Sequence, residues 1–289
     1  MMRSNRRLKS LLILSLLLAL LISSMAIGRS VAAATITVAN TLDDGPGSLR
    51  QAISDANQGD RIIFDPSISG ETITLMSNTG TLKIDKNLVI DGSALVGQIT
   101  ISGSNNMNVI YITGSASVTL DSLIITDGKA KYGSGIDNSG TLTVSNCTIY
   151  GNEALYEGGG IRNLGTLIVA NSILYGNTVS STFSDPSNGG GIFNQGNLIL
   201  LNSTLSNNSS KDNGGGIYNN GTLTVTKSTL SNNSVEDNGG GIYNNGTLSV
   251  TNSTFSKNSA FDGGGIYNFA ALELINSTLS GNSAGCIGG

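Results

Sequence analysis

The chain has 289 residues, of which 39 are Gly, 3 are Pro and none is His or Trp. Charged residues make up only 12% and the formal net charge is −4, so the sequence lacks the basic stripe that nucleic-acid binding requires. Without His, the commonest general base is missing from any catalytic site. We therefore expect no nucleic-acid partner, and polar chemistry must come from the abundant Asn, Ser and Thr.

The first 34 residues are organised like a secretory signal peptide. Four basic residues within the first nine positions precede an apolar run from Leu11 to Ile22, and small residues follow up to Ala34. The alternative, a membrane anchor, needs about 20 apolar residues, and this run is shorter. We expect cleavage after Ala34, or alternatively after Ala26. The mature chain would be secreted, extracellular or held at the cell surface, with no membrane span.

Residues 35–80 are expected to form an N-terminal cap with a short helix over residues 48–57. Ser48, followed three positions later by Gln51, predicts a capping box at the start of this helix. Apolar residues at helical spacing would let it lie across the open end of the following sheets. These residues are Leu49, Ala52, Ile53 and Ala56. The alternative is a small independent domain.

From residue 133 the sequence repeats with a period of about 25 residues. The units begin at Gly133, Gly158, Gly189, Gly214, Gly239 and Gly263, each the first Gly of a Gly-rich triplet followed by Ile. One longer step contains an insertion within residues 178–188. Apolar and hydroxyl residues alternate in each unit, as in residues 222–226, which is the pattern of half-buried strands. Each unit therefore predicts three short strands separated by Gly and Asn turns.

Such a unit favours one rung of a parallel β-helix over a leucine-rich repeat or a propeller blade. Each rung buries its Ile, Leu and Val only by stacking on its neighbours, and crossovers between parallel strands are right-handed. We predict an all-β fold, a single-stranded right-handed parallel β-helix over residues 81–289 with about 25 residues per rung. The last rung would be bare, which indicates a covering partner, end-to-end self-association or a shortened member of a longer class.

One Asn recurs five positions after the first Gly of every unit. These residues are Asn138, Asn163, Asn194, Asn219, Asn244 and Asn268. A buried amide needs hydrogen-bond partners, and stacked rungs supply them if each side-chain amide bonds the next. The sequence thus predicts a structural Asn ladder. A second Asn closes each unit, at Asn152, Asn177, Asn208, Asn233, Asn258 and Asn282.

Acidic residues before several Gly triplets could form a calcium-binding column. The candidates are Asp212, Asp237 and Asp262, with Glu236 and Glu157 near the same corner. Rungs stack about 5 Å apart, so carboxylates in one column could share a Ca²⁺ ion. The alternative is a solvated turn, where Asp is an ordinary residue. We expect no other cofactor.

Aromatic residues follow the Ile of the triplet in the last four units. They are Phe193, Tyr218, Tyr243 and Tyr267. If the Ile points inward, the rings point outward by alternation and could form a ligand platform for sugars. The alternative is that neighbouring rings only stabilise the sheet.

Two further features bear on chemistry. Asp43 and Asp44 stand in a Leu-Asp-Asp-Gly-Pro-Gly segment. This segment predicts a turn and not a catalytic pair, and we predict no catalytic residue.

Cys147 occupies a place that other units fill with Ser, and more than five repeats separate it from Cys286. A disulfide needs Cα atoms closer than about 7 Å, and residues more than five repeats apart are farther apart than that. We therefore predict no disulfide between the two cysteines.

The units resemble the repeats of chlamydial polymorphic membrane proteins, with Gly-Gly-Gly-Ile followed by an apolar-x-x-Asn motif such as Phe255 to Asn258. The segment from Asn40 to Ile53 resembles the opening of secreted bacterial β-helix proteins of the pectin-lyase-like fold. The resemblance implies an adhesive or structural protein outside the cell, with a surface glycan or protein as ligand. It also implies an alternative, a polysaccharide lyase or glycoside hydrolase. Such an enzyme would need carboxylates clustered with Arg or Lys on one face, whereas the repeats carry mainly Asn, Ser and Thr. A third possibility is a remnant without activity.

Overall fold

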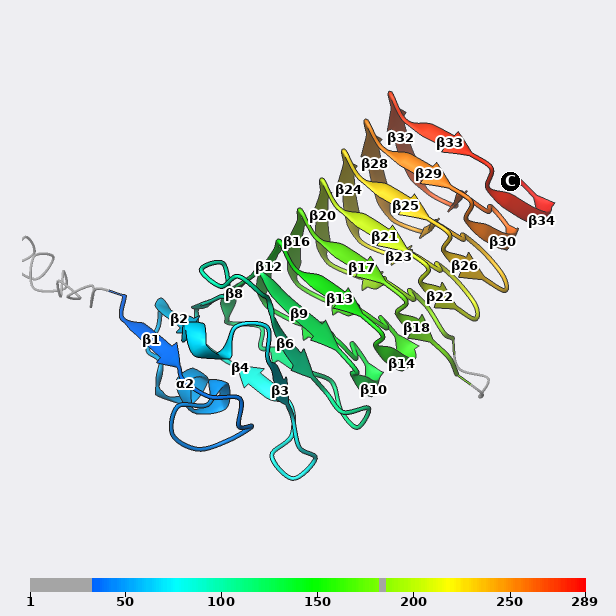
Figure 1. Ribbon diagram of the computed structural model, residues 1–289. Coiled ribbons are helices and arrows are strands. Elements are labelled where there is room, and N and C mark those ends of the chain that lie inside the picture. The colour runs from blue at the N-terminus through cyan, green and yellow to red at the C-terminus, as the bar shows by residue number, and fades with distance from the viewer. Residues whose placement is uncertain (1–32, 182–185) are drawn as a thin grey trace, which may run out of the picture. The chain divides into compact units, whose positions relative to one another are not determined.

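The structure, a computed structural model, describes residues 33–181 and 186–289 (Figure 1). The predicted signal peptide therefore lies outside the described residues, apart from its last two positions. Residues 33–289 form one compact unit. This unit is an all-β parallel solenoid of about 10 turns with about 25 residues per turn, which confirms the predicted fold class.

Each full turn of the regular region adds one strand to each of four parallel sheets, which we call A, B, C and D (Figure 1). The prediction of three strands per turn is wrong, because sheet D is a fourth. Its strands are as short as the two residues Ser209–Ser210. A pair of Ser residues carries none of the β-branched or aromatic enrichment that identifies a strand in a sequence.

The strands of sheets A and B follow one another at every turn. Sheet A contains β1 (Thr35–Val38), β2 (Asp60–Phe64), β5 (Leu88–Asp91), β8 (Ser117–Asp121), β12 (Thr141–Ser145), β16 (Thr166–Ala170), β20 (Asn197–Leu201), β24 (Thr222–Thr226), β28 (Thr247–Thr251) and β32 (Ala271–Ile275). Sheet B contains β3 (Thr72–Thr74), β6 (Ile99–Ser102), β9 (Leu123–Thr126), β13 (Thr148–Tyr150), β17 (Ile173–Tyr175), β21 (Thr204–Ser206), β25 (Thr229–Ser231), β29 (Thr254–Ser256) and β33 (Thr278–Ser280).

Sheet C closes the turns from β4 onward, and from β10 onward a strand of sheet D precedes it. Sheet D contains β10 (Lys129–Tyr132), β14 (Glu153–Glu157), β18 (Thr178–Val179), β22 (Ser209–Ser210), β26 (Ser234–Val235), β30 (Ser259–Asp262) and β34 (Ser283–Ile287). Sheet C contains β4 (Leu82–Ile84), β7 (Ile110–Ile112), β11 (Ile136–Asn138), β15 (Ile161–Asn163), β19 (Ile192–Asn194), β23 (Ile217–Asn219), β27 (Ile242–Asn244) and β31 (Ile266–Asn268).

The core follows from alternation along each strand. In β24, Leu223 and Val225 are fully buried while the intervening Thr residues face outward. Leu223 stands in register with Leu198 and Leu248 on the neighbouring turns, so like stacks on like. Each fully buried Leu or Val contributes about 1.5–3 kcal/mol, and no turn can bury these residues without its neighbours.

Residues in the left-handed conformation make the corner between sheets A and B. In most turns this residue is Asn, which tolerates positive φ better than other non-Gly residues. The corner residues Asn146, Asn171, Asn202, Asn252 and Asn276 have φ between 47° and 53°. Ser122 and Lys227 hold the same corner at φ 58° and 50°, so two turns place a less suited residue there, and Lys227 is the larger of the two.

Lys227→Asn is therefore expected to stabilise the protein by about 0.5–1 kcal/mol, because the left-handed conformation costs a side chain such as Lys roughly 1–2 kcal/mol. A thermal melt checks this. Lys211→Asn is the matched control, since Lys211 has no positive φ, and it should change the melting temperature little. A Lys227→Asn variant that melts at or below the native temperature would contradict the account of this corner.

Only the first Gly of each triplet is required by a positive φ. Gly214 has φ +67°, whereas Gly215 and Gly216 have no positive φ. A Cβ on Gly215 would lie 2.4 Å from the carbonyl oxygen of Ser234, and one on Gly216 would lie 2.5 Å from that of Gly241. The second and third glycines are thus required by the close approach of neighbouring turns.

Helix α2 (Leu49–Asp55) lies beside β1 at the N-terminal end of the sheets (Figure 1). The hydroxyl of Ser48 accepts a hydrogen bond from the Gln51 backbone N–H at 3.1 Å. The Gln51 side chain donates to Asp55 and not back to Ser48, so only half of the predicted capping box forms. The four apolar residues predicted for this helix are buried in the common core.

The segment 35–80 also contributes β1, β2, β3 and the 3-10 turn η1 (Pro66–Ile68). The first two of these strands pair in sheet A and β3 pairs in sheet B, so the segment shares its sheets and core with the turns that follow. The division between cap and solenoid at residue 80 stays a prediction.

Asp43 links the loop before α2 to the following segment. It is 5% exposed and accepts hydrogen bonds from Arg50 at 2.7 Å, from the Met76 backbone N–H at 3.0 Å and from Thr79. Burial raises the pKa of this carboxyl, but the hydrogen bonds from Thr79, Arg50 and Met76 outweigh it and hold the pKa below its usual value. These contacts give Asp43 a structural role.

The last turn exposes residues that are buried in the turns before it. Leu272 and Leu274 of β32 are 40% and 43% exposed, whereas their register partners Leu248 and Val250 are 1% and 0% exposed. These side chains are exposed because no further turn stacks on β32 among the described residues.

Candidate functional site

The predicted Asn residues of sheet C form a continuous hydrogen-bonded ladder. The side-chain amide of each donates to the side-chain oxygen of the next at 2.7 Å, from Asn138 through Asn163, Asn194, Asn219 and Asn244 to Asn268. All except the last are fully buried. The ladder satisfies buried amides that would otherwise cost free energy, so its role is structural.

Two further ladders were not predicted as such. The second set of Asn residues, from Asn152 to Asn282, is bonded in the same way at 2.9–3.0 Å. A Ser column joins backbone N–H groups to the hydroxyl of the next turn, and Cys147 occupies its first position as predicted. In the sequence, both ladders are indicated by the same feature: an Asn or a Ser recurs at one position of each unit.

The two cysteines are both free thiols, as predicted. Cys147 is buried and Cys286 is exposed. Burial raises the pKa of the Cys147 thiol to about 12, so this side chain stays protonated at physiological pH and acts as a packing group.

The carboxylates predicted as a calcium column do not share one column. Asp262 stands in register with Asn238, not with Asp237, because the unit that begins at Gly239 is one residue shorter than the others of regular length. Asp212 accepts from the Ser187 backbone N–H at 2.6 Å and Asp262 from that of Ile287 at 2.9 Å. In the part of the chain that the structure describes, no three His, Cys, Asp or Glu side chains group as metal ligands. Calcium binding by these residues, including Glu236, stays a prediction that a titration of the melting temperature tests.

The aromatic residues of sheet C form a stacked column. Phe193, Tyr218, Tyr243 and Tyr267 lie in register, with successive ring centroids 5.1, 5.0 and 5.6 Å apart and interplanar angles of 1°, 5° and 15°. Parallel rings at this spacing cover one another's faces. A sugar platform along the column would need free ring faces. Because the faces are covered by the neighbouring rings, the column presents only ring edges and hydroxyls.

The same outward position carries different residues in the two preceding turns. Asp137 and Arg162 stand there, in register with each other and with Phe193. Arg162 Nε donates to Glu157 Oε2 at 2.9 Å, and Arg162 Nη1 lies 3.4 Å from Asp137 Oδ2. The guanidinium carbon lies 4.7 Å from the ring centroid of Tyr132, a cation–π contact.

Glu157 and Tyr132 depart from the repeat as well. They stand directly before the Gly triplet, at the corner between sheets D and C, where the next three turns carry Asn188, Asn213 and Asn238. We call Tyr132, Asp137, Glu157 and Arg162 the ionic cluster. On the same two turns, both the residue before the Gly triplet and the residue after its Ile differ from those of the later turns. The four differing residues are linked by contacts through Arg162. Local departures from a consistent pattern are where function is expected in a protein.

Asp137 carries an unfavourable charge in this cluster. Burial raises the pKa of its carboxyl above the usual value, and the attraction of Arg162 does not fully offset this. Its second oxygen, Oδ1, is buried without a hydrogen-bond partner among the described residues. A charge retained at a cost in stability is typical of a functional position.

Asp137→Asn is expected to be more stable than the native protein at pH 7. Because the folded pKa is raised, the folded chain binds more protons than the unfolded chain between the ordinary value of 3.8 and the raised value. Native stability therefore falls as pH rises through this window. Melting temperatures measured from pH 3 to pH 8 should separate the two proteins above the window and merge below 3.8. An Asp137→Asn variant that is less stable at pH 7 would contradict this assignment.

A cleft of about 510 Å³ lies beside the ionic cluster; we call it the aromatic cleft. Its lining residues are Lys131, Tyr132, Tyr156, Glu157, Pro186, Asn188, Phe193, Gln195 and Tyr218. The rings of Tyr132 and Tyr156 are 5.5 Å apart but tilted by 41°, so they do not cover each other as the stacked column does. The one insertion in the repeats ends at this cleft, through Pro186 and Asn188.

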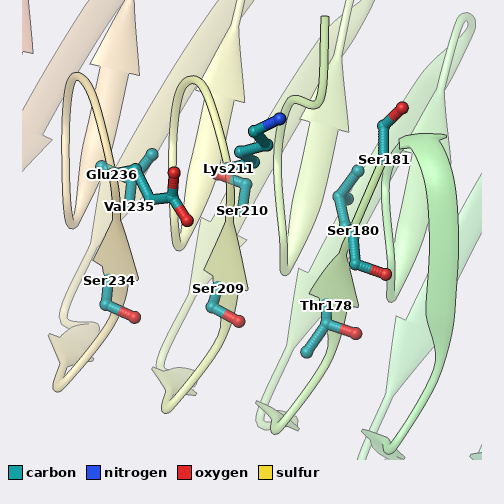
Figure 2. A pocket seen from close by; sticks show the side chains of 10 residues that line it. Thr178, Ser180, Ser181, Ser209, Ser210, Lys211, Ser234, Val235 and Glu236 are labelled. Atoms are coloured by element: carbon teal, nitrogen blue, oxygen red, sulfur yellow. The ribbon is translucent and has the colours of Figure 1, made fainter. Parts of the chain in front are cut away.

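A larger hollow of about 770 Å³ lies over sheet D (Figure 2). Thr178, Ser209 and Ser234 occupy one position on three successive turns, and Figure 2 shows their small hydroxyl side chains along it. Lys211 and Glu236 stand on neighbouring turns farther along the chain. Among the described residues, no aromatic ring lines this hollow, and its lining is mainly of hydroxyl side chains. The aromatic cleft combines polar groups with aromatic rings and is the better candidate site.

The fold and ladders define the class of a parallel β-helix with a surface cleft. The chain belongs to the right-handed β-helix family: the family model described as "Right handed beta helix region" matches residues 57–255. No curated protein matches the chain significantly. Within the described ranges, no helix is both long enough and apolar enough to span a bilayer.

Proposed function

We propose that this chain is an extracellular or cell-surface β-helix module that binds a glycan in the aromatic cleft and has an adhesive, non-catalytic role. The observation that carries the proposal is the ionic cluster. Four residues depart from the repeat on two adjacent turns, contact one another and border a cleft with uncovered ring surface.

The composition of the cleft supports a sugar ligand. Ligand sites combine apolar and aromatic surface with a few placed polar groups. Tyr132 and Tyr156 supply ring surface and Tyr218 supplies a ring edge with its hydroxyl, while Glu157, Gln195 and Lys131 supply an acceptor, an amide and a donor. The ladders beneath hold the backbone of these turns rigid, and a rigid site loses little entropy when it binds a ligand.

The location outside the cell rests on the sequence. The basic, apolar and small-residue order of residues 1–34 is that of an export signal. The resemblance of the repeats to those of secreted and surface β-helix proteins points the same way. Expression with and without residues 1–34 tests the location directly. We expect the full chain to be secreted into the medium and the chain that lacks residues 1–34 to stay inside the cell.

One observation favours the alternative, a polysaccharide lyase or hydrolase. Asp137, Arg162 and Glu157 are a carboxylate cluster with a basic residue on one face, the arrangement that such an enzyme needs. Both carboxylates are engaged by one guanidinium. We therefore assign the cluster to positioning and ligand binding, and the assay below measures product release together with binding.

The test is a glycan array of neutral and anionic polysaccharide fragments, probed with native protein and with the double variant Tyr132→Ala, Tyr156→Ala. We expect native binding to at least one glycan, and a loss of about tenfold or more in affinity, roughly 1.4 kcal/mol, in the variant. Chromatography of each bound glycan after prolonged incubation should show no shorter product.

Tyr150→Ala is the matched control, because Tyr150 stacks on Tyr175 in sheet B and lines neither cleft nor hollow described above. It should bind as the native protein does. Absence of binding to every glycan, or equal binding by the cleft variant, would contradict the proposal. Shorter products would favour the enzyme instead.

End-to-end self-association stays a prediction from the sequence. Sedimentation velocity of the full chain tests it: a concentration-dependent dimer would support association, and a protein that stays monomeric at all concentrations would contradict it.

A further inference from the structure

The aromatic cleft is not isolated on sheet C. A second cleft of about 330 Å³, which we call the N-terminal cleft, lies over earlier turns of the same sheet. It is lined by Thr81, Lys83, Asn108, Tyr111 and Asp137. Thr81 donates to the Asn108 side-chain oxygen at 2.6 Å, so part of this polar lining is already fixed.

The two clefts lie along one column of outward-facing residues. Lys83, Tyr111 and Asp137 stand in register on three successive strands, and Arg162, Phe193 and Tyr218 continue the same register. Tyr111 and Tyr218 are four turns apart, which is about 19 Å at about 4.8 Å per strand. Asp137 lines the N-terminal cleft and contacts Arg162, whose other partner Glu157 lines the aromatic cleft. A single ion-paired group thus separates the two clefts.

Three cations and two carboxylates lie along this column. Arg162 is ion-paired with both carboxylates, Asp137 and Glu157. The remaining cations are Lys83 in the N-terminal cleft and Lys131 in the aromatic cleft, one in each. A polyanion would need a run of unpaired cations and a polycation a run of unpaired carboxylates. One lysine in each cleft is not such a run, and both carboxylates are already paired.

We infer that the ligand is an uncharged linear polysaccharide that runs parallel to the solenoid axis and fills both clefts, with Tyr111 as the aromatic contact of a second subsite. This inference rests on the proposed function, because it specifies the class of glycan and its direction. Chain length, and not the identity of one terminal sugar, then determines affinity, because the second subsite is reached only by a ligand long enough to cross Arg162.

Calorimetry with cello-, manno- and xylo-oligosaccharides, as trimers and hexamers, tests this on the full chain. The native protein should bind the hexamer of at least one series about tenfold or more tighter than its trimer. Tyr111→Ala should remove this gain and leave trimer affinity unchanged within about twofold. Tyr150→Ala is the control and should retain the gain.

The outcomes separate this inference from the proposed function. Equal affinity for trimer and hexamer, or a gain that Tyr111→Ala does not reduce, would overturn the second subsite while leaving glycan binding in the aromatic cleft intact. Binding of polygalacturonate fragments in preference to every neutral series would overturn the neutral class. Failure of all these series, together with failure of the glycan array, would remove the proposed function and this inference with it.

Discussion

Asn233→Ala is expected to lower the free energy of unfolding by about 3–5 kcal/mol, since each buried group left without a partner costs about 1–3 kcal/mol. The Asn233 oxygen accepts from the backbone N–H and the side chain of Asn208, and its amide donates to Leu205 and Asn258. Alanine leaves these partners buried and unbonded on both neighbouring turns. Chemical denaturation checks the loss.

Asn245→Ala is the matched control. Asn245 donates to Asn220 on the preceding turn at 3.1 Å, so it makes the same kind of bond between turns, but at an exposed position. Water replaces that bond, and a surface change of this kind alters stability by about 0.5 kcal/mol or less. Similar losses in the two variants would show that burial of the ladder is not what makes it stabilising.

Arg162→Met is expected to cost about 2–3 kcal/mol at pH 7. Removal of one partner from a fully buried ion pair costs about 3–5 kcal/mol, and the side chains of Arg162, Asp137 and Glu157 retain 22%, 14% and 24% exposure. The variant leaves two carboxylates beside one another without their cation. The loss should shrink as pH falls through the raised pKa of Asp137, because a protonated carboxyl no longer needs the guanidinium.

Lys129→Met provides the comparison, because Lys129 pairs with Glu153 at 2.9 Å while the two side chains are 52% and 41% exposed. Exposed pairs contribute about 0–1 kcal/mol, so this variant should melt close to the native protein across the pH range. A loss for Arg162→Met that is no larger, or that is independent of pH, would contradict the electrostatic account of the ionic cluster.

The repeat made most of the fold predictable. A fixed period forces equivalent residues into register, so the sequence identified the parallel solenoid, the ladder of Asn219 and its equivalents, and the place of Cys147 in the Ser column. Helix α2 was predictable from Ser48 and its apolar spacing. The reciprocal half of the capping box was not, because the Gln51 side chain has Asp55 as a competing partner on the same helix face.

The candidate site was less predictable, for physical reasons that differ between residues. Sequence reasoning attended to residues that recur, whereas Asp137, Arg162, Glu157 and Tyr132 are informative because they do not. Their contacts depend on the corner between sheets D and C, and sheet D was not expected. The signal was nevertheless present: two columns of the repeat change residue type at the same units.

The structure bears on two site predictions through details of stacking. A calcium column that includes Asp262 requires it to align with Asp237, and one missing residue in the unit that begins at Gly239 shifts it beside Asn238. The ligand platform required open ring faces, and alternation predicts only that a side chain points outward. Rings on every successive turn cover one another, so a repeated aromatic column favours sheet stability, and the unrepeated Tyr132 and Tyr156 favour a ligand.

The central claim, glycan binding without catalysis in the aromatic cleft, is tested most directly by ligand-observed NMR of a linear hexasaccharide, first a neutral one and then an anionic one, incubated with the full native chain. The account predicts saturation transfer from protein to sugar that Tyr132→Ala, Tyr156→Ala abolishes, with anomeric signals that stay unchanged over a day. Absence of transfer for every glycan tried, neutral or anionic, or growth of new reducing-end signals, would contradict it.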